Sequence, residues 1–461
     1  MRIHWHRRDL RLTDNPALVA DESPVIGCFV FDPAVLAHAG TPRVNFLINC
    51  IATLRRNYRQ GGGDLIVRTG DPIEQLLRLH DETDIDAISW EQDYSGFARQ
   101  RDGTVRKQLE EHDIDVISRD GAVCHPPGDI TTQNGDPYKV FSYYGKKWLQ
   151  REKATSANPP AEYLDCDVVP GTIPDPDEYV DSELTATLPP AGTDAAHERL
   201  DSFCSGPIET YSNQRDMPAE EGTSRISQDL HFGTIGIRTV WEATERTKRD
   251  TEATASIEEF QRQLAWREFY TQVIWDRPDT VHAPFKTFEQ PVQWRDDPAG
   301  VQRWKDGTTG FPIVDAGMRQ LRQEAWMHNR VRMIVASFLT KDLLVDWRVG
   351  YAWFRAQLVD HDTANDVGGW QWAASTGTDA QPYFRIFNPM TQSERYDPNA
   401  RYIKRYVPAL KDVAPEAIHT WDEMSSEARN RIAPDYPAPI VDHAKRREMA
   451  LQMFQTARGD A

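Results

Sequence analysis

The chain has 461 residues, and its 71 acidic against 53 basic side chains give a formal net charge of -18 at pH 7. This length predicts two or three domains, with enough chain to bury a core around a cofactor. No run of eighteen apolar residues occurs, which excludes a membrane-spanning helix, and the five cysteines show neither CxxC nor metal-ligand spacing.

Residues 1–135 alternate between strand-like and helix-like segments, which is typical of a parallel, doubly wound α/β sheet. Helices are predicted over 43–59, from Pro72 onward and over 97–111. The absence of GxGxxG after the first strand argues against a dinucleotide site there. The predicted strands are 3–6, 25–31, 65–68, 87–90 and 115–118.

Residues 136–199 are predicted to connect this domain to a second one. From 154 to about 196 the sequence is rich in Pro, Asp and Gly with little periodicity, which is typical of a segment that lies over the surface. Residues 200–461 are predicted to form a helical domain, because apolar residues recur at three- and four-residue spacings. The clearest helical segments are 256–275, 314–325, 328–345 and 348–358.

One stretch of the helical region, 357–390, concentrates polar and aromatic side chains. Glycines allow a backbone to approach a ligand, and indoles offer apolar faces beside it. The stretch is therefore predicted to line a pocket for a large, flat, partly charged ligand. A glycine-rich loop with two core tryptophans is the structural alternative. The residues concerned are Asp360, His361, Asp362, Asn365, Asp366, Gly368, Gly369, Trp370 and Trp372.

Part of this stretch, GGWQWAASTGTDAQPYFRIFNP, resembles the flavin-binding core of the photolyase/cryptochrome family. The resemblance covers essentially the whole chain and is closest to class I cyclobutane pyrimidine dimer photolyases. It implies an α/β antenna-type domain followed by a helical domain that holds FAD. Further segments that resemble family motifs, in the family's order, are EGTSRIS (221–227), LAWREFY (264–270), GFPIVDAGMRQL (310–321), WMHNRVRM (326–333) and ASFLTKDLLVDW (336–347).

The resemblance implies which residues hold FAD. EGTSRIS offers hydroxyls, backbone N–H groups and a guanidinium that suit a pyrophosphate, although an ordinary helix start has the same residues. The resemblance implies that Asp360 pairs with an arginine over the ring system, a role that Arg332 fits, and such a buried pair needs both partners because an unpaired buried charge is costly. The implied cofactor-binding residues are Tyr211, Thr223, Ser224, Arg225, Ile226, Ser227, Arg267, Asn329, Arg332, Asp360, His361, Asp362 and Asp366.

Asp366 occupies the family position beside the redox nitrogen of the flavin's central ring, where many photolyases carry Asn and plant cryptochromes carry Asp. A carboxyl buried against an electron-rich ring could donate a proton. Trp370, Trp347 and Trp294 match the family's electron-transfer chain from inner to outer, and three core indoles are the structural alternative. Trp304 is a further tryptophan nearby, but its position does not match the chain.

Other side chains match family positions that contact the lesion or its DNA strand. Gln263 departs from the pattern, because dimer photolyases usually have Glu there, whereas (6-4) photolyases and animal cryptochromes have Gln. The (6-4) class needs histidines where this chain has Asn329 and Met333, so the dimer class is favoured. Four arginines between 319 and 332 predict a basic patch. The implied substrate-binding residues are Arg215, Gln263, Trp266, Tyr270, Asn329, Arg330, Met333, Trp372 and Gln392.

The resemblance implies light-driven repair of cyclobutane pyrimidine dimers, in which a flipped-out lesion accepts an electron from photoexcited reduced FAD. A cryptochrome-type photoreceptor, favoured by Asp366, and a (6-4) photolyase, favoured by Gln263, are the alternatives. A plain flavoprotein oxidoreductase is more distant. A second antenna chromophore, either methenyltetrahydrofolate or 8-hydroxy-deazaflavin, is left open, with YSGFARQRD (94–102) at the family's antenna position.

The expected partner is DNA that contains pyrimidine dimers, and the expected state is a monomer in the cytoplasm, because the N-terminus lacks the apolar run of a signal peptide. Only 12 of the 53 basic residues are lysine, which favours a salt-loving cytoplasm. At molar salt the Debye length falls to roughly 3 Å, so long-range repulsion of DNA would hardly matter. Short-range contacts by arginine would still work.

Overall fold

The computed structural model describes residues 1–21, 24–83, 85–160, 163, 168–180 and 182–460. The N-terminal domain is built on a parallel sheet with the strand order β3-β2-β1-β4-β5, which confirms the predicted doubly wound arrangement. Each predicted strand is present to within one residue at either end. The strands are β1 (Arg2–His6), β2 (Val25–Phe31), β3 (Leu65–Thr69), β4 (Ala87–Glu91) and β5 (Asp115–Arg119).

Helices make up most of the remaining chain. The α-helices are α1 (Pro33–Leu36), α2 (Thr41–Gln60), α3 (Pro72–Thr83), α4 (Gly96–Glu110), α5 (Phe141–Gln150), α6 (Thr193–Cys204), α7 (Pro207–Gln214), α8 (Ser227–Phe232), α9 (Ile237–Asp250), α10 (Thr254–Asp276), α11 (Pro298–Asp306), α12 (Pro312–Glu324), α13 (Asn329–Ser337), α14 (Trp347–Gln357), α15 (Thr363–Ala373), α16 (Pro389–Tyr396), α17 (Arg401–Tyr406), α18 (Pro415–His419), α19 (Ser426–Ile432) and α20 (His443–Arg458). Short 3-10 turns occur at Pro176–Glu178, Pro278–Val281 and Pro408–Leu410, and a π-helical turn at Phe338–Asp342.

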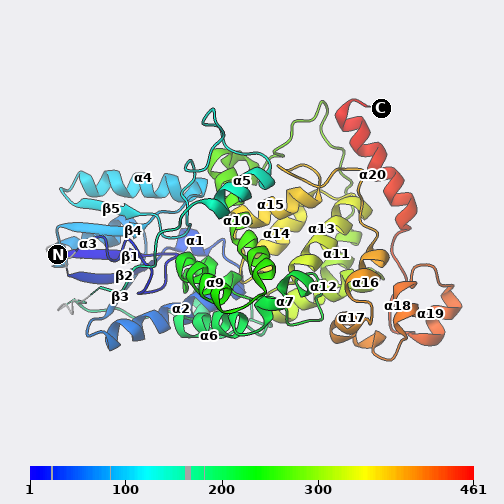
Figure 1. The fold of residues 1–461 in the computed structure, drawn as a ribbon, viewed down its shortest axis with the longest axis horizontal. Coiled ribbons are helices and arrows are strands. Elements are labelled where there is room, and N and C mark those ends of the chain that lie inside the picture. Colours follow the sequence, from blue (N-terminus) through cyan, green and yellow to red (C-terminus); the bar gives the residue numbers. More distant parts are fainter. Residues whose placement is uncertain (22–23, 84, 161–162, 164–167, 181, 461) are drawn as a thin grey trace.

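The two faces of the sheet are buried by different helices, because successive side chains of a strand point to opposite faces. Ile3 and Trp5 of β1 belong to an apolar cluster with residues of α3 and α4. Phe29 and Phe31 of β2 belong to a second cluster with residues of α2. Figure 1 shows α4 above the sheet and α2 below it. Helices thus cover both faces, as a nearly continuous apolar sequence in the strands requires.

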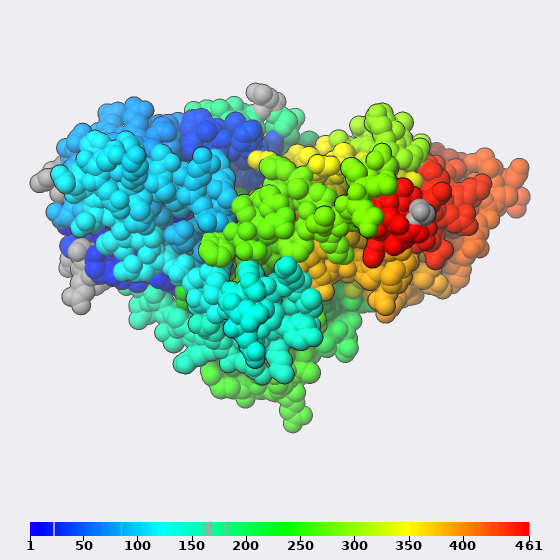
Figure 2. All heavy atoms as spheres, turned by 90° about the horizontal axis from the view of Figure 1, so that it is seen from above, coloured from blue at the N-terminus to red at the C-terminus, as the bar shows by residue number. Residues whose placement is uncertain are grey.

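The long helix α10 organises the helical domain. It packs against α5, α7, α9 and α15, and the apolar cluster around it includes Phe141 of α5. Helix α5 lies inside the predicted connector, 136–199, ahead of the part predicted to lie over the surface, and contributes to the helical layer. Figure 2 shows the N-terminal domain, in blue and cyan, at one end of the molecule and the last helices, in orange and red, at the other.

The segment predicted as one helix over 328–345 is interrupted. Helix α13 ends at Ser337, a π-helical turn follows, and Leu344 has a left-handed backbone with φ 61°. The wider turn accompanies full burial of Lys341 and Asp342, which are 2% and 0% exposed. Apolar periodicity extends through the whole segment, so it could not reveal where the backbone hydrogen bonds change register.

No helix of the described part of the chain is long and apolar enough to cross a membrane. Four cysteines of that part, Cys28, Cys50, Cys124 and Cys204, are free thiols. Cys166 lies outside the described residues.

Candidate functional site

The glycine-containing part of the stretch 357–390 forms a helix, α15, with a capped start. Asp362 is the cap, because its Oδ1 accepts hydrogen bonds from Asn365, at 3.0 Å from the backbone N–H and 2.9 Å from Nδ2. A Cβ at Gly368 would lie 2.2 Å from the ring of Tyr270, whereas a Cβ at Gly369 would meet open space. One glycine thus lets α15 approach α10, and the next leaves room beside the helix. The alternative of a glycine-rich loop is wrong.

Arg332 joins two of the predicted carboxylates. Its Nη2 donates to both oxygens of Asp360, at 3.0 and 2.7 Å, which confirms the predicted pair. Its Nη1 lies 3.7 Å from one oxygen of Asp366, and the other oxygen lies 2.5 Å from Nδ1 of His361. Burial opposes the charge of Arg332, but the two carboxylates outweigh it and raise the pKa of Arg332. Asp366 therefore lies in a polar network with Arg332 and His361, and its place beside the flavin ring stays a prediction.

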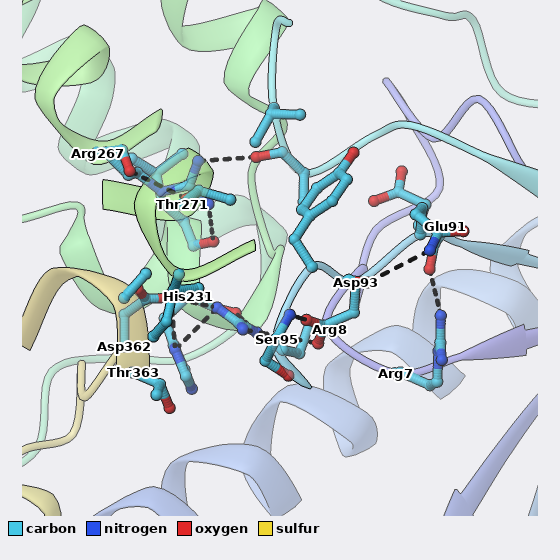
Figure 3. Close-up of a pocket in the computed structure, with 17 residues that line it drawn as sticks. Arg7, Arg8, Glu91, Asp93, Ser95, His231, Arg267, Thr271, Asp362 and Thr363 are labelled. Carbon is cyan, nitrogen blue, oxygen red and sulfur yellow. Dashed lines mark hydrogen bonds and ion pairs between the residues drawn. The ribbon is translucent and has the colours of Figure 1, made fainter. Parts of the chain in front are cut away.

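Asp362 also links the helical domain to the N-terminal domain (Figure 3). Its Oδ2 accepts a hydrogen bond from Nη2 of Arg8 at 2.7 Å, and Nε of Arg8 donates to the carbonyl oxygen of His231 at 3.0 Å. Burial opposes ionisation of Asp362, but Arg8, Arg267 and His231 together hold its pKa below the ordinary value. These groups line a cavity of about 50 Å³ where the two domains meet.

The predicted phosphate-binding turn, 223–227, immediately precedes α8. Ile226, which is 3% exposed, anchors the turn in the core, and the two hydroxyl residues that open it are half-buried. Arg225 is exposed, has a left-handed backbone with φ 50°, and lies 4.1 Å from the ring centre of Trp326. Oγ of Ser227 accepts a hydrogen bond from Nε1 of Trp326 at 3.2 Å. Nη2 of Arg225 also pairs with Oε2 of Glu324 at 2.5 Å, so two of the polar side chains of the turn are engaged with protein.

Burial separates the outer tryptophan of the predicted relay from the other two, which are equally buried. Trp370 and Trp347 are 2% and 1% exposed, whereas Trp294 is only partly buried and packs edge-to-face on Phe454 of α20, with ring centres 5.9 Å apart. The structure also places Trp304 edge-to-face with Trp370 at 6.1 Å. Trp304 was not part of the predicted relay, because its position does not match the family's electron-transfer chain. Its contact with Trp370 was therefore not predicted.

The residues predicted to contact DNA include two groups that Asp216 connects. On α10, Oε1 of Gln263 lies 3.4 Å from Nη2 of Arg215, the residue that ends α7. In the first turn of α13, Arg330 forms an ion pair with Asp216 at 2.8 Å. Asp216 also lies 3.8 Å from Nε of Arg215. Two arginines and one amide that are far apart in the sequence therefore form one surface.

Aromatic members of the predicted DNA set are already engaged with protein. Trp266 stacks on Phe141, with ring centres 3.6 Å apart and planes 9° apart, and lies 5.5 Å from the ring of Tyr270. Trp372 is partly buried and lies 6.2 Å from a neighbouring phenyl ring. Gln392 is half-buried on α16. One face of the Trp266 indole is therefore covered, which limits how it can stack on a base.

The predicted basic patch over 319–332 is not one surface. Arg319 and Arg322 donate to backbone carbonyl oxygens in and just after α11, at 3.0 and 2.8 Å. Arg330 turns to Asp216, and Arg332 turns inward to the buried carboxylates. The prediction is wrong because helical spacing and the turn before α13 send the four side chains in different directions.

Comparison with known proteins matches both parts of the chain. The family described as "DNA photolyase" matches residues 2–162, and the family described as "FAD binding domain of DNA photolyase" matches residues 260–456. A protein of Halobacterium salinarum named deoxyribodipyrimidine photo-lyase is 54% identical, over 100% of both chains. The chain belongs to the DNA photolyase family.

Other photolyases agree over nearly the whole length. The deoxyribodipyrimidine photo-lyase of Synechococcus sp. is 40% identical over 98% of this chain and 96% of that one. Among solved structures, a class III photolyase from Agrobacterium tumefaciens has a TM-score of 0.92 and 34% identity, covering 99% of this chain and 98% of that one. A Synechocystis sp. cryptochrome has a TM-score of 0.91 and 25% identity, covering 98% and 99%. These similarities confirm the predicted fold.

The side chains of this photolyase fit FAD. The partly buried turn 223–227 offers hydroxyls, backbone N–H groups and the exposed guanidinium of Arg225, which suit a pyrophosphate. Arg332, which is partly exposed, and the buried Asp366 offer a donor and an acceptor of the kind that a polar ring edge needs. The open space at Gly369 is the kind of gap that lets a flat ligand approach a helix. Tyr211 is 7% exposed on α7 and packs against aromatic side chains of α6 and α10.

A larger cleft of about 610 Å³ lies between the two domains of the photolyase. Its walls combine aromatic rings, such as Phe31, Phe97 and Tyr351, with the guanidinium groups of Arg43 and Arg101. Aromatic rings beside cations are suited to a flat anionic ligand. Part of the segment predicted to lie at the antenna position, 94–102, lines this cleft.

Several residues of the site have no sequence motif. Arg8 lies within the opening HRRDLRL, which resembles the family's first domain, yet nothing there indicated a contact with Asp362, 354 residues away. His231, Asp216 and Glu259 were missed entirely. Their contacts cross between elements distant in the chain, and such contacts leave no periodic signal.

Proposed function

We propose that this photolyase repairs cyclobutane pyrimidine dimers in DNA in a light-dependent reaction. The observation that carries the proposal is the surface formed by Gln263, Arg215 and Arg330, which combines an amide for a pyrimidine edge with two guanidinium groups for phosphates. A relative of the same length, 54% identical, is named for this activity. A neutral amide both donates and accepts hydrogen bonds, so it suits a ring N–H beside a carbonyl without desolvating a charge.

In this mechanism the protein binds a lesion that has left the base stack, which costs least where the bases are already poorly paired. Arginines hold the phosphates on either side and fix the register. Gln263 reads the pyrimidine edge, and Trp266 offers the ring face that Phe141 does not cover. The proposed substrate site is completed by Tyr270, Trp372 and Gln392. It also includes Asn329 and Met333 on one face of α13, where Nδ2 of Asn329 lies 3.8 Å from the sulfur of Met333.

FAD, when bound in its reduced state and excited by light, supplies the electron that opens the dimer. The turn residues Thr223 to Ser227, with Tyr211 beside them, are proposed to hold its phosphates. Arg332 is held in one position by Asp360, so its remaining N–H groups can donate to the ring edge. Arg267 and Asp362 lie together in the cavity beside α15 and fix the domain junction there. Asp366 and His361 share a close contact that can hold a proton near the ring.

The tryptophans are proposed to carry electrons between the surface and the cofactor site. Trp370 and Trp347 are buried, where an indole is shielded from solvent, and Trp294 reaches the partly exposed end. This order allows an external reductant to act at Trp294 while the inner rings stay dry.

A photoreceptor of the cryptochrome type is the second candidate. Asp366 favours it, as does the similarity to the Synechocystis sp. cryptochrome, which has a TM-score of 0.91. A (6-4) photolyase is disfavoured, because the side chains at its two histidine positions, Asn329 and Met333, do not transfer protons near neutral pH.

The test is a repair assay with duplex DNA that carries one cyclobutane dimer or one (6-4) photoproduct, in blue light and in darkness. We expect dimers to disappear in light only and (6-4) photoproducts to persist. A protein that takes up FAD and responds spectrally to light, yet repairs neither lesion, would be a photoreceptor. Loss of (6-4) photoproducts alone would make Gln263 the decisive residue.

We also propose that the 610 Å³ cleft binds a second chromophore, with folate and deazaflavin both open, and that the protein is a monomer of the cytoplasm. The free thiols of the described residues support a reducing compartment. The proposed division is an antenna-type domain over 1–135, a connector over 136–199 and a catalytic domain over 200–461. Spectra of the purified protein before and after chromophore addition test the first point, and sedimentation tests the second.

A further inference from the structure

The carboxylate of Glu259 is the centre of a small hydrogen-bonded cluster on the proposed lesion surface. Its Oε1 forms an ion pair with Nη1 of Arg215 and accepts a hydrogen bond from Nε2 of Gln263 at 2.9 Å. Its Oε2 lies 3.3 Å from Nη1 of Arg262. Glu259 lies one turn before Gln263 on α10, and its side chain is 25% exposed. One carboxylate thus engages the amide and two guanidinium groups.

This cluster fixes which way the Gln263 amide points. Its NH₂ group donates to the Glu259 carboxylate and to the Glu259 backbone carbonyl at 3.2 Å, while its Oε1 faces Nη2 of Arg215 at 3.4 Å. An amide nitrogen donates and an amide oxygen accepts, so the Glu259 carboxylate beside Nε2 and the Arg215 guanidinium beside Oε1 both favour this orientation over the flipped one. Glu259 therefore selects one of two orientations of the residue proposed to read the pyrimidine.

Asp216 repeats the arrangement beside it. It pairs with Arg330 at 2.8 Å and lies 3.8 Å from Arg215. Around the proposed lesion surface, three guanidinium groups therefore face two carboxylates. In a protein of net charge -18, the arginines expected to bind phosphate are held by internal acids before DNA arrives.

We propose that Glu259 is a positioning and specificity-determining residue for recognition of damaged DNA, an inference that rests on the proposed lesion surface. Undamaged DNA offers Arg215 a phosphate only, and that phosphate has to displace the Glu259 carboxylate and then lie near its negative charge. A flipped-out dimer also offers a ring N–H, which the oxygen of the oriented Gln263 amide can accept because its NH₂ group is engaged with Glu259. The carboxylate thus penalises both kinds of DNA, and only the lesion has a compensating contact.

The test compares binding of wild type and Glu259→Gln to duplexes with and without one dimer, in darkness, at several salt concentrations. Gln keeps the shape and an acceptor oxygen but removes the charge. Glu258→Gln is the matched control, because Glu258 is the neighbouring acid on α10, is 54% exposed and pairs with Lys248 instead. Glu259→Asp, which keeps the charge, is the rescue variant. FAD content confirms that every variant is folded.

We expect Glu259→Gln to bind undamaged DNA about fivefold more tightly, the size that one partly exposed ion pair supports, while dimer binding changes less. The affinity of Glu259→Gln for DNA should fall more steeply with salt concentration, by the amount expected for about one added phosphate contact, because Arg215 becomes free to bind DNA. Glu258→Gln should change neither the ratio of dimer to undamaged affinity nor the salt dependence of binding. Glu259→Asp should keep most of the preference for dimer DNA over undamaged DNA.

An unchanged ratio of dimer to undamaged affinity in Glu259→Gln, or a change that Glu258→Gln reproduces, would overturn the inference. Failure of the proposed function is a separate result: the wild type would then not distinguish dimer DNA from undamaged DNA at all and would repair nothing in light. A wild type that discriminates and repairs, with a Glu259→Gln variant that discriminates equally well, contradicts only the role of Glu259.

Discussion

Arg8, in the loop after the first strand, and Asp362, which caps α15, form an ion pair at 2.7 Å across the junction of the two domains. The contact ties the N-terminal domain directly to the helix that carries Asp366 and Trp370. A change in the position of one domain would therefore move the first turn of α15. This pair therefore fixes the start of α15 against the N-terminal domain.

The first prediction concerns this pair and pH. The pKa of Asp362 is held below its ordinary value, so its contribution to stability is fully present above the unfolded pKa of about 3.9 and is lost as pH falls below that value. Asp362→Asn should therefore lower the thermal midpoint at neutral pH and flatten its decline below about pH 4. Because the Arg8 side chain is 37% exposed, the expected loss is about 1 kcal/mol, smaller than for a fully buried pair.

Thermal unfolding between about pH 3 and 7 measures this effect. Arg8→Gln should give the same loss at neutral pH, and the double variant should lose little more than either single one, because each change removes the same interaction. Additive losses would show that Arg8 and Asp362 act separately.

The second prediction concerns electron transfer. Trp294→Phe should slow photoreduction of oxidised FAD at least tenfold, about the effect of 1.4 kcal/mol on a barrier, and leave dimer repair unchanged when the flavin is reduced chemically beforehand. Trp304→Phe is the control, because Trp304 contacts Trp370 but is fully buried, and its Nε1 donates to the carbonyl oxygen of Val335 at 3.1 Å. Equal loss of both activities in Trp294→Phe would assign this residue a structural role.

The third prediction concerns Asp366 and the flavin. Asp366 contacts His361 at 2.5 Å and lies 3.7 Å from Arg332, so replacing it with Asn removes a charge from the centre of that network. We expect the absorbance of one-electron-reduced flavin in Asp366→Asn to shift from the protonated toward the unprotonated form. The spectrum of each protein during stepwise chemical reduction gives the answer. Identical spectra in the two proteins would place Asp366 away from the redox centre.

The fourth prediction concerns salt. The net charge is -18, and lysine is scarce, so mutual repulsion between surface carboxylates should weaken the fold in dilute buffer. The thermal midpoint should rise by several degrees from dilute buffer to molar KCl, because salt screens this repulsion. A sucrose series at constant ionic strength separates screening from general solute effects. A midpoint that stays level or falls in KCl would argue against a salt-adapted protein.

The fifth prediction concerns lesion recognition by Gln263. Gln263→Glu alone would place a second carboxylate where Nε2 now lies 2.9 Å from Glu259, so repulsion should weaken dimer binding severalfold. The charge-swapped variant, Gln263→Glu with Glu259→Gln, keeps one carboxylate beside Arg215 and should recover binding and repair. Affinity for dimer DNA and repair per absorbed photon are the measurements. Undiminished binding in Gln263→Glu alone would show that the two side chains do not share one site.

The sequence by itself determined the layout of the chain. Apolar runs such as 25–31 identify buried strands, and helical spacing over 256–275 identifies α10, because both patterns are repeated many times within one element. The resemblance to the family also predicted one contact correctly, the pair of Asp360 with Arg332, because both residues match positions that pair in the family.

Only the tertiary structure decided which other side chains meet. Arg8 contacts Asp362 across 354 positions of the chain, and Trp304 contacts Trp370. Glu259 and Asp216 pair with arginines that were predicted from the sequence to bind DNA. Each of these contacts depends on the packing of two elements whose separation along the chain carries no periodic signal. An acid beside an arginine is favourable in many arrangements of similar energy, so the choice among them is made by the backbone that the apolar core has already placed.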